Sequence, residues 1–137
     1  MSDIIFFIGR VLVVIVMVTN GVAHLTKERP VKYAEFKKIP SAALAVRVSG
    51  ICMLLGAVGI VLGALGDLAA LLSALLMLII TITLHNFWTL EDEQARATDQ
   101  SHFLKNLALI GGLLVIAWAF SNGGGINLIA PVWAPAA

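Results

Sequence analysis

Four long apolar segments alternate with polar connections along the chain. They cover about residues 4–22, 42–65, 68–88 and 102–120. Each is about 20 residues long, which is the length at which a helix crosses a hydrocarbon core about 30 Å thick. Runs such as residues 11–18 lack the period-two alternation of barrel strands. The pattern predicts an all-α integral membrane four-helix bundle with four transmembrane helices.

Composition supports the membrane interpretation over a soluble bundle. Hydrophobic residues make up 60% of the chain and charged residues 12%, whereas charged residues are about a quarter of an ordinary soluble domain. The middle turns of all four segments are apolar on nearly every face, so water has no polar stripe to solvate. At 137 residues the chain has room for one domain, and we expect a single transmembrane domain over residues 1–137.

Several classes of protein and segment are excluded at this stage. A net charge of +1 argues against nucleic acid as a partner, because phosphate recognition needs a concentrated basic face. The single cysteine, Cys52, excludes an intrachain disulfide. The first residues lack the basic region and the cleavage site of a signal peptide, so the first apolar segment is expected to be retained.

Counting the crossings assigns each connection to one side of the membrane. The N-terminus, the turn at 63–67 and the tail after Ser121 share one side, called side A. Segments 23–41 and 89–101 share the other, called side B. Side B holds nearly all lysines and arginines, so the positive-inside rule places both segments in the cytoplasm and both termini outside.

The two side B segments differ in charge. Segment 23–41 is basic and carries Tyr33 and Phe36 among lysines, a pattern that suits either a short helix in the headgroup region or a solvated loop. Segment 89–101 is acidic, with Asp99 among its carboxylates. It could pair with the basic segment, but we expect a solvated connection because exposed ion pairs contribute less than about 1 kcal/mol.

Small residues line one face of the second apolar segment. They follow one another at spacings of three and four, which lets two helix backbones approach closely in lipid. We expect this face to pack against a neighbouring helix or against a second copy of the chain in a homo-oligomer. Its members are Ser49, Cys52, Gly56, Gly59 and Gly63.

Polar side chains converge at the side B ends of all four apolar segments. An ionisable residue within a transmembrane helix is costly and indicates a functional site. A buried amide such as that of Asn106 must form hydrogen bonds within the bundle, and Trp88 fits the aromatic belt of this membrane face. The candidate ligand-binding pocket comprises Asn20, His24, Arg47, His85, Asn86, Trp88, His102, Lys105 and Asn106.

Two long cations within the apolar segments have simpler explanations. Arg10 shares a helix face with Asn20 and His24 but lies near side A, and we expect it to extend toward the side A headgroups rather than to be buried. Lys105 either reaches the side B headgroups in the same way or meets an acceptor such as Asn86 or a neutral histidine.

The three histidines favour proton exchange over metal binding. His24, His85 and His102 are isolated in the sequence, and no HxxxH or ExxH spacing fixes two metal ligands on one helix. A haem between two of them is equally disfavoured. Histidine exchanges protons near neutral pH, which suits a polar head such as a quinone ring at the membrane surface with its tail in the bundle.

Several stretches together resemble the DoxX family of small four-helix membrane proteins. They are residues 84–88 (LHNFW) and 101–112 (SHFLKNLALIGG), with further agreement at Gly9-Arg10 and at 20–24 (NGVAH). The resemblance extends over about residues 5–120. It implies a bundle in a bacterial inner membrane, a link to quinone-dependent oxidoreduction, and in some relatives a role as membrane partner of soluble redox enzymes. No cofactor or mechanism follows from it.

The chain departs from this family pattern in three places. Family members often carry a carboxylate within the second helix, where this chain reads Gly50-Ile51-Cys52-Met53. Many also carry an arginine in the turn that holds Asp67 here, and a basic C-terminus, whereas this tail is uncharged. Those positive charges imply that side A faces the cytoplasm in such relatives, opposite to the orientation expected here.

Three functions compete. The first is a membrane subunit of a quinone-linked oxidoreductase, with the side B residues holding a quinone or another lipid-like ligand. The second is a non-catalytic anchor that binds a soluble redox enzyme through Lys27, Arg29, Lys37 and Lys38. A transporter is the weakest, because no segment has a Gly/Pro break at the bilayer midplane. No activated nucleophile, phosphate-binding loop or carboxylate pair indicates an enzyme complete in itself.

Overall fold

The computed structural model describes residues 2–125, 127–129, 131 and 132. In chain order its elements are α1 (Ser2–Thr26), α2 (Arg29–Phe36), α3 (Ala42–Leu62), α4 (Gly66–Leu84), the 3-10 helix η1 (Phe87–Thr89) and α5 (Glu93–Ser121). Helices α1, α3, α4 and α5 are long and apolar enough to cross a membrane. The expected all-α membrane bundle with four spanning helices is confirmed.

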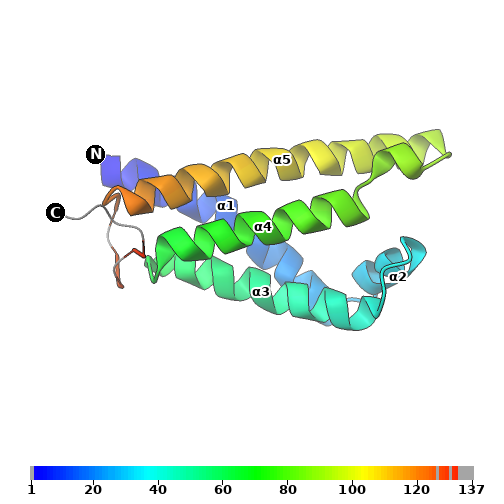
Figure 1. Cartoon of the computed structure of the whole chain (residues 1–137), viewed down its shortest axis with the longest axis horizontal. Helices are drawn as coiled ribbons and strands as arrows, with labels where there is room; N and C mark the ends of the chain where they lie inside the picture. Colours follow the sequence, from blue (N-terminus) through cyan, green and yellow to red (C-terminus); the bar gives the residue numbers. More distant parts are fainter. Residues whose placement is uncertain (1, 126, 130, 133–137) are drawn as a thin grey trace.

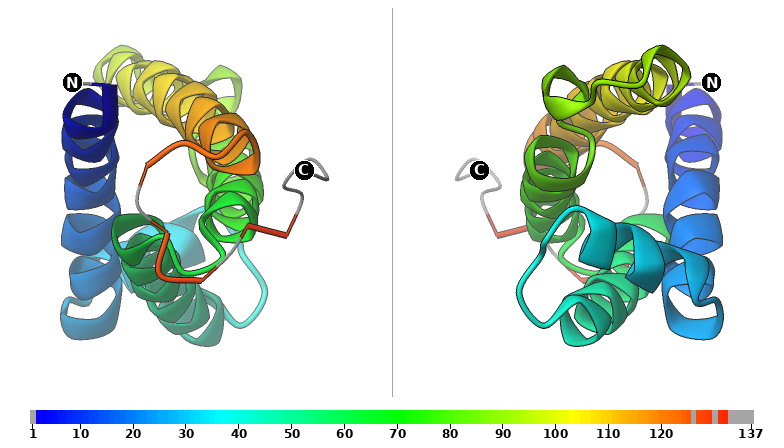
Figure 2. Two further views of the ribbon diagram at one scale, coloured as in Figure 1. Left: turned by 90° about the vertical axis from the view of Figure 1, so that its left-hand side faces the viewer. Right: turned by 90° about the vertical axis from the view of Figure 1, so that its right-hand side faces the viewer.

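The four long helices run up and down in chain order (Figure 1). The N-terminus, the α3–α4 turn and the segment after α5 lie at one end, which is side A. Helix α2 and the α4–α5 connection lie at the other end, which is side B. Contact is extensive between α4 and α5, between α1 and α3, and between α3 and α4, but slight between α1 and α5. The four helices therefore do not close into a ring, because the bundle is open between α1 and α5 (Figure 2).

Apolar side chains fill the interior and also cover the outside. Outward-facing residues such as Leu12, Leu55 and Val115 are more than half exposed, as expected where lipid rather than water surrounds the helices. Ser73 and Thr81 are buried, and each donates its hydroxyl to a carbonyl one turn earlier in α4. The core comprises Val14, Met17, Met53, Ala57, Ile60, Ala70, Ala74, Met77, Leu113, Ile116 and Phe120.

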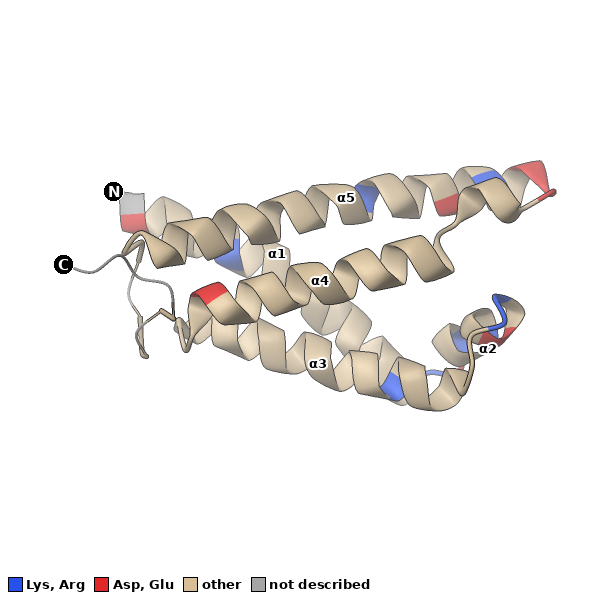
Figure 3. Cartoon of the chain, in the orientation of Figure 1, with Lys and Arg blue, Asp and Glu red and all other residues tan. Residues whose placement is uncertain are grey.

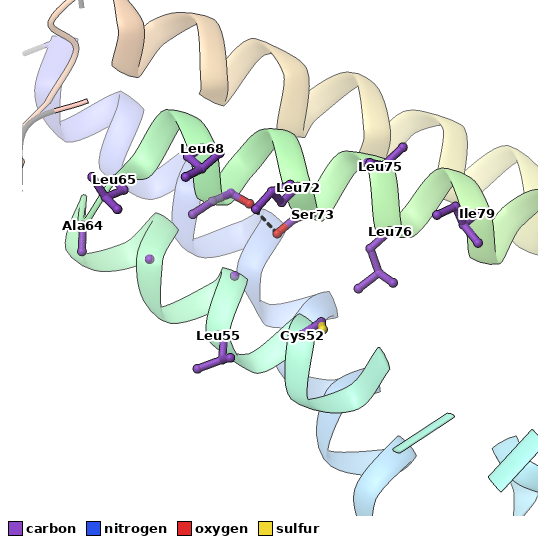
Figure 4. Close-up of a pocket in the computed structure, with 13 residues that line it drawn as sticks. Cys52, Leu55, Ala64, Leu65, Leu68, Leu72, Ser73, Leu75, Leu76 and Ile79 are labelled. Carbon is purple, nitrogen blue, oxygen red and sulfur yellow. Dashed lines mark hydrogen bonds between the residues drawn. The ribbon is translucent and has the colours of Figure 1, made fainter. Parts of the chain in front are cut away.

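The small residues of α3 bring it close to α4. A Cβ added at Gly56 would lie 2.2 Å from Ser73 Oγ, and one at Gly59 would lie 2.7 Å from Ala69 Cβ. These glycines therefore pack against a neighbour within the same chain. An apolar groove of about 490 Å³ flanks this contact on the outer face, where Cys52 and Leu72 line it (Figure 4). Self-association through this face stays a prediction.

The side B connections are more helical than expected. Of the two alternatives for segment 23–41, the structure shows the short helix, α2. Helix α5 begins at Glu93 rather than near residue 102, because Asp92 caps it by accepting the Ala95 N–H at 2.7 Å. Residues 93–101 therefore belong to α5 rather than to a connection, and they are exposed as expected except for Asp99, which is 4% exposed.

Arg10 is buried in the bundle, so the expected extension toward the headgroups is wrong. Its guanidinium lies about 5 Å from the ring centroids of Phe6, Phe7 and Phe120. Its Nη1 donates to the carbonyl of Ile60 at 3.3 Å. That carbonyl belongs to the last turn of α3, where carbonyls lack partners within the helix and the helix dipole favours a cation. In the buried position Arg10 therefore caps α3 and packs among three aromatic rings.

The contact between α3 and α4 leads to a stability prediction. We expect Gly59→Ala to lower the free energy of unfolding by about 1–3 kcal/mol, since the added methyl group must displace the backbone that carries Ala69. The matched control is Gly111→Ala in α5, where an added Cβ meets nothing within 4 Å. Thermal unfolding in detergent micelles measures both. Equal melting temperatures for the two variants would contradict the packing described here.

Candidate functional site

A polar cavity of about 350 Å³ lies at the side B end of the bundle. Its walls come from α1, α2, α3, α4 and α5, so segments far apart in the sequence meet there. Both apolar side chains, such as Met53 and Met77, and polar ones, such as His24 and His85, line it. The lining residues are Asn20, His24, Arg29, Pro30, Tyr33, Val46, Met53, Met77, Ile80, Leu84, His85, Thr98, Asp99, His102, Lys105 and Asn106.

Six of the nine residues expected in a pocket line this cavity: Asn20, His24, His85, His102, Lys105 and Asn106. The other three lie elsewhere. Arg47 donates to the carbonyls of His24 and Leu25 in the last turn of α1, and so caps that helix. Asn86 accepts from Lys37. Trp88 is 52% exposed and packs edge-to-face on Phe87 and Phe103.

Asp99 is the centre of the polar network beside the cavity. The Tyr33 hydroxyl donates to its carboxylate at 2.5 and 2.6 Å, and Lys37 Nζ donates to Oδ2 at 2.8 Å. The side chains of Lys37 and Asp99 are 5% and 6% exposed. Lys37 also donates to Asn86 Oδ1 at 2.7 Å. The acidic and basic segments therefore pair, and they do so as a buried and fully hydrogen-bonded group.

Two histidines stack against each other next to this network. The rings of His85 and His102 have centroids 5.2 Å apart at an interplanar angle of 28°. His85 Nδ1 lies 3.3 Å from Asp99 Oδ1, and a carboxylate without a proton can only accept there. His85 therefore carries its proton on Nδ1, which leaves Nε2 as the nitrogen for a ligand or for proton exchange.

His24 is oriented in a comparable way on α1. Its Nδ1 lies 2.8 Å from Ser49 Oγ, and the Ser49 hydroxyl donates its single hydrogen to the carbonyl of Val46. Ser49 must therefore accept from His24. This places the proton on Nδ1 and leaves Nε2 as an acceptor, as in His85.

Lys105 and Asn106 follow each other on α5 but differ in environment. Lys105 is exposed, and its Nζ lies 3.4 Å from Nδ1 of His102. This agrees with one of the two expectations for Lys105, which was contact with a histidine acceptor. Asn106 is 3% exposed and lines the cavity. Within the described part of the chain its amide makes no hydrogen bond.

Burial raises the pKa of the Tyr33 hydroxyl above its ordinary value, and the hydrogen bond to the negative charge of Asp99 adds to this effect. The hydroxyl therefore stays a donor throughout the physiological range. Its ring also stacks on His85, with centroids 6.3 Å apart.

The sequence interpretation missed Arg29, Tyr33, Lys37, Thr98 and Asp99. One signal for Asp99 was present: Asp99, His102 and Asn106 follow at spacings of three and four, which places them on one helical face. The signal was overlooked because α5 was expected to begin after Asp99. The contribution of α2 depends on how that helix folds back over the bundle, which no local spacing encodes.

The chemistry of the site is hydrogen bonding and proton exchange around a polar ligand. Most charged residues lie at this end of the bundle (Figure 3). Among the described residues, no group of three or more His, Cys, Asp or Glu side chains is placed to hold a metal ion. The cavity volume falls within the range of about 300–1,000 Å³ that is typical of small-molecule sites.

Comparison with known protein families identifies the family of the chain's first four helical elements. A sequence model of the DoxX family matches residues 5–86, which span α1 to the end of α4 and include His24 and His85. No curated protein and no solved structure matches the chain.

The buried pair of Lys37 and Asp99 generates a stability prediction. We expect Asp99→Asn to cost about 3–5 kcal/mol of folding free energy, because it leaves the Lys37 ammonium buried without a counter-charge. Adding Lys37→Met should restore part of the loss. Thermal unfolding in nanodiscs and hydrogen exchange over residues 29–41 measure both effects. Lys32→Met is the control, since Lys32 is 72% exposed. Additive losses in the double variant would contradict a coupled pair.

Tyr33 can be titrated by itself, because it is the chain's single tyrosine. We expect the folded protein to show no tyrosinate absorbance as the pH passes about 10, where free tyrosine ionises. The denatured chain should titrate there. Asp99→Asn should bring the folded-state titration closer to the ordinary value, since it removes the negative charge. A folded protein that titrates together with the denatured chain would disprove the Tyr33–Asp99 contact.

Proposed function

The chain belongs to the DoxX family, and from that premise we propose that it is the membrane subunit of a quinone-linked oxidoreductase system. The side B cavity would hold the polar head of a quinone, with the tail among the apolar side chains of the bundle. The observation that supports this proposal most is that oriented histidines and apolar side chains line one cavity at the end of the membrane span.

The histidines suit the proton chemistry of a quinone. Reduction of a quinone to a quinol takes up two electrons and two protons, and each ring carbonyl becomes a hydroxyl. In this proposal the electrons come from a partner redox enzyme. His24 and His85 each have Nε2 available, and an imidazole nitrogen can take up a proton and transfer it to a ring oxygen.

Asp99 acts on this chemistry as a positioning residue. It fixes the proton of His85 on Nδ1, as a carboxylate commonly does for a histidine whose other nitrogen is in use. The imidazolium that forms when His85 takes up a proton is stabilised by the adjacent negative charge. Asp99 itself keeps its charge, because Lys37 and Tyr33 both donate to it.

We further propose that the protein lies in a bacterial inner membrane with side B in the cytoplasm. Arg10 is the sole lysine or arginine on the side A half of the sequence pattern, and the other eight of the nine lie at side B. The positive-inside rule then places α2 and the α4–α5 connection in the cytoplasm.

A second candidate function is a membrane anchor for a soluble redox enzyme. Lys27, Arg29 and Lys38 are exposed at the side B surface and could attract an acidic partner. Lys37 does not belong to this surface, because its ammonium is buried against Asp99. The two functions are compatible, since an anchored partner would also be the source of electrons.

The quinone proposal is tested by what the purified protein retains. We expect protein extracted in mild detergent to carry quinone, and His85→Ala and Asn106→Ala to lower its occupancy at least about tenfold, which corresponds to the loss of about 1.4 kcal/mol of binding free energy. Asn122→Ala, at the exposed side A end of α5, is the matched control. Quinone is quantified in the lipid extract of each sample.

The proposal would be overturned if the wild-type extract held no quinone and if both cavity variants kept the oxidoreductase activity of the system unchanged. The anchor would then be the better explanation of the positive charge at the surface around α2, and release of a bound enzyme on neutralising Lys27, Arg29 and Lys38 would be its signature.

A further inference from the structure

The charge in the side B cavity is not balanced by the residues of the described chain. Asp99 is the one carboxylate among the lining residues, and it is already paired with Lys37. Arg29 and Lys105 also line the cavity, and within the described residues neither forms an ion pair. With the histidines neutral, two exposed cations therefore border the cavity without a carboxylate partner among the described residues.

A buried amide faces the same space. Asn106 is 3% exposed, lines the cavity and makes no hydrogen bond within the described residues. Its amide opens onto the cavity, where a ligand can reach its N–H donors. A ligand that brings an acceptor oxygen to this position gains a hydrogen bond, and the ligand that also pairs with two cations is an anion.

One side of the cavity lies between α1 and α5, whose contact is slight, and this boundary is called the seam. Helices α1 and α5 meet near side A, where the rings of Phe6 and Phe120 lie 5.2 Å apart and Val13 lies beside Gly112. Toward side B they diverge (Figures 1 and 2). Among the described residues no hydrogen bond or ring contact joins them there, although both line the cavity through Asn20 and His102.

We infer that the side B cavity binds an amphiphile whose head carries an oxyanion, with Arg29 and Lys105 as its charge partners, the Asn106 amide as a donor, and the tail in the seam between α1 and α5. The oxyanion is a phosphate, a carboxylate or an ionised ring hydroxyl. The inference rests on the proposed function for the location of the site, and it adds the charge of the head and the route from the bilayer.

Three probes separate the parts of this inference in micelles of an uncharged sugar-headed detergent, which brings no oxyanion of its own. Dodecyl phosphate carries both head and tail, dodecanol carries the tail alone, and inorganic phosphate carries the head alone. We expect dodecyl phosphate to bind at least about tenfold more tightly than either of the others, because the binding free energies of the head and the tail both contribute to its affinity. Calorimetric titration measures all three.

Variants assign the binding to the residues named. Arg29→Gln with Lys105→Gln should weaken dodecyl phosphate at least about tenfold and leave dodecanol unchanged. Both side chains are exposed, so the fold should tolerate the change, and the melting temperature verifies this. Asn106→Asp keeps the size of the side chain and should likewise disfavour only the phosphate. Lys32→Gln, outside the cavity, is the control.

The outcomes are distinct. Equal affinity for dodecyl phosphate and dodecanol would overturn the charged head, and equal affinity for dodecyl phosphate and inorganic phosphate would overturn the amphiphile from the bilayer in favour of a free oxyanion. If quinone is retained but no preference for the anion appears, this inference fails and the proposed function stands. If the preference appears in protein that holds no quinone, the proposed function fails and this inference stands.

Discussion

A carboxylate that leaves water must replace its hydration with hydrogen-bond donors, and at Asp99 these donors come from α2, from the loop after it and from the end of α4. Tyr33, Lys37 and His85 supply them within 3.3 Å. Because a buried charge without a partner costs several kcal/mol, the three segments cannot separate independently. The same contact holds α2 over the bundle, closes one wall of the cavity and fixes the tautomer of His85.

Two arginines carry out a related task at the helix ends. Arg10 donates to a carbonyl in the last turn of α3, and Arg47 donates to carbonyls in the last turn of α1. Carbonyls at a helix end lack partners within the helix, and in hydrocarbon no water replaces them. A cation at this position also complements the helix dipole. Both side chains therefore stabilise the scaffold, and the cavity is left to other residues.

The spanning helices could be predicted from the sequence because hydrocarbon imposes a length and an apolar surface that a single chain reveals. The gathering of His24, His85, His102 and Asn106 at side B followed from the same count of crossings. Asp99 could not be placed in this way. Acidic residues near a membrane surface are usually solvated, and its burial depends on Tyr33 and Lys37, which reach it across more than 60 positions of sequence. The burial of Arg10 could not be predicted for the same reason, because one of the aromatic rings around it, Phe120, belongs to α5 at the far end of the sequence.

The divergence of α1 and α5 gives the bundle a wedge shape, narrow at side A and broad at side B. Lateral pressure within a bilayer varies with depth, so a wedge exchanges mechanical work with the leaflet around its broad end. A molecule in the seam holds the wedge open, and thermodynamic linkage makes the coupling reciprocal. On the inference that an amphiphile occupies the seam, its binding is coupled to the packing of the surrounding lipids, and the bilayer would act on this protein as an effector as well as a solvent.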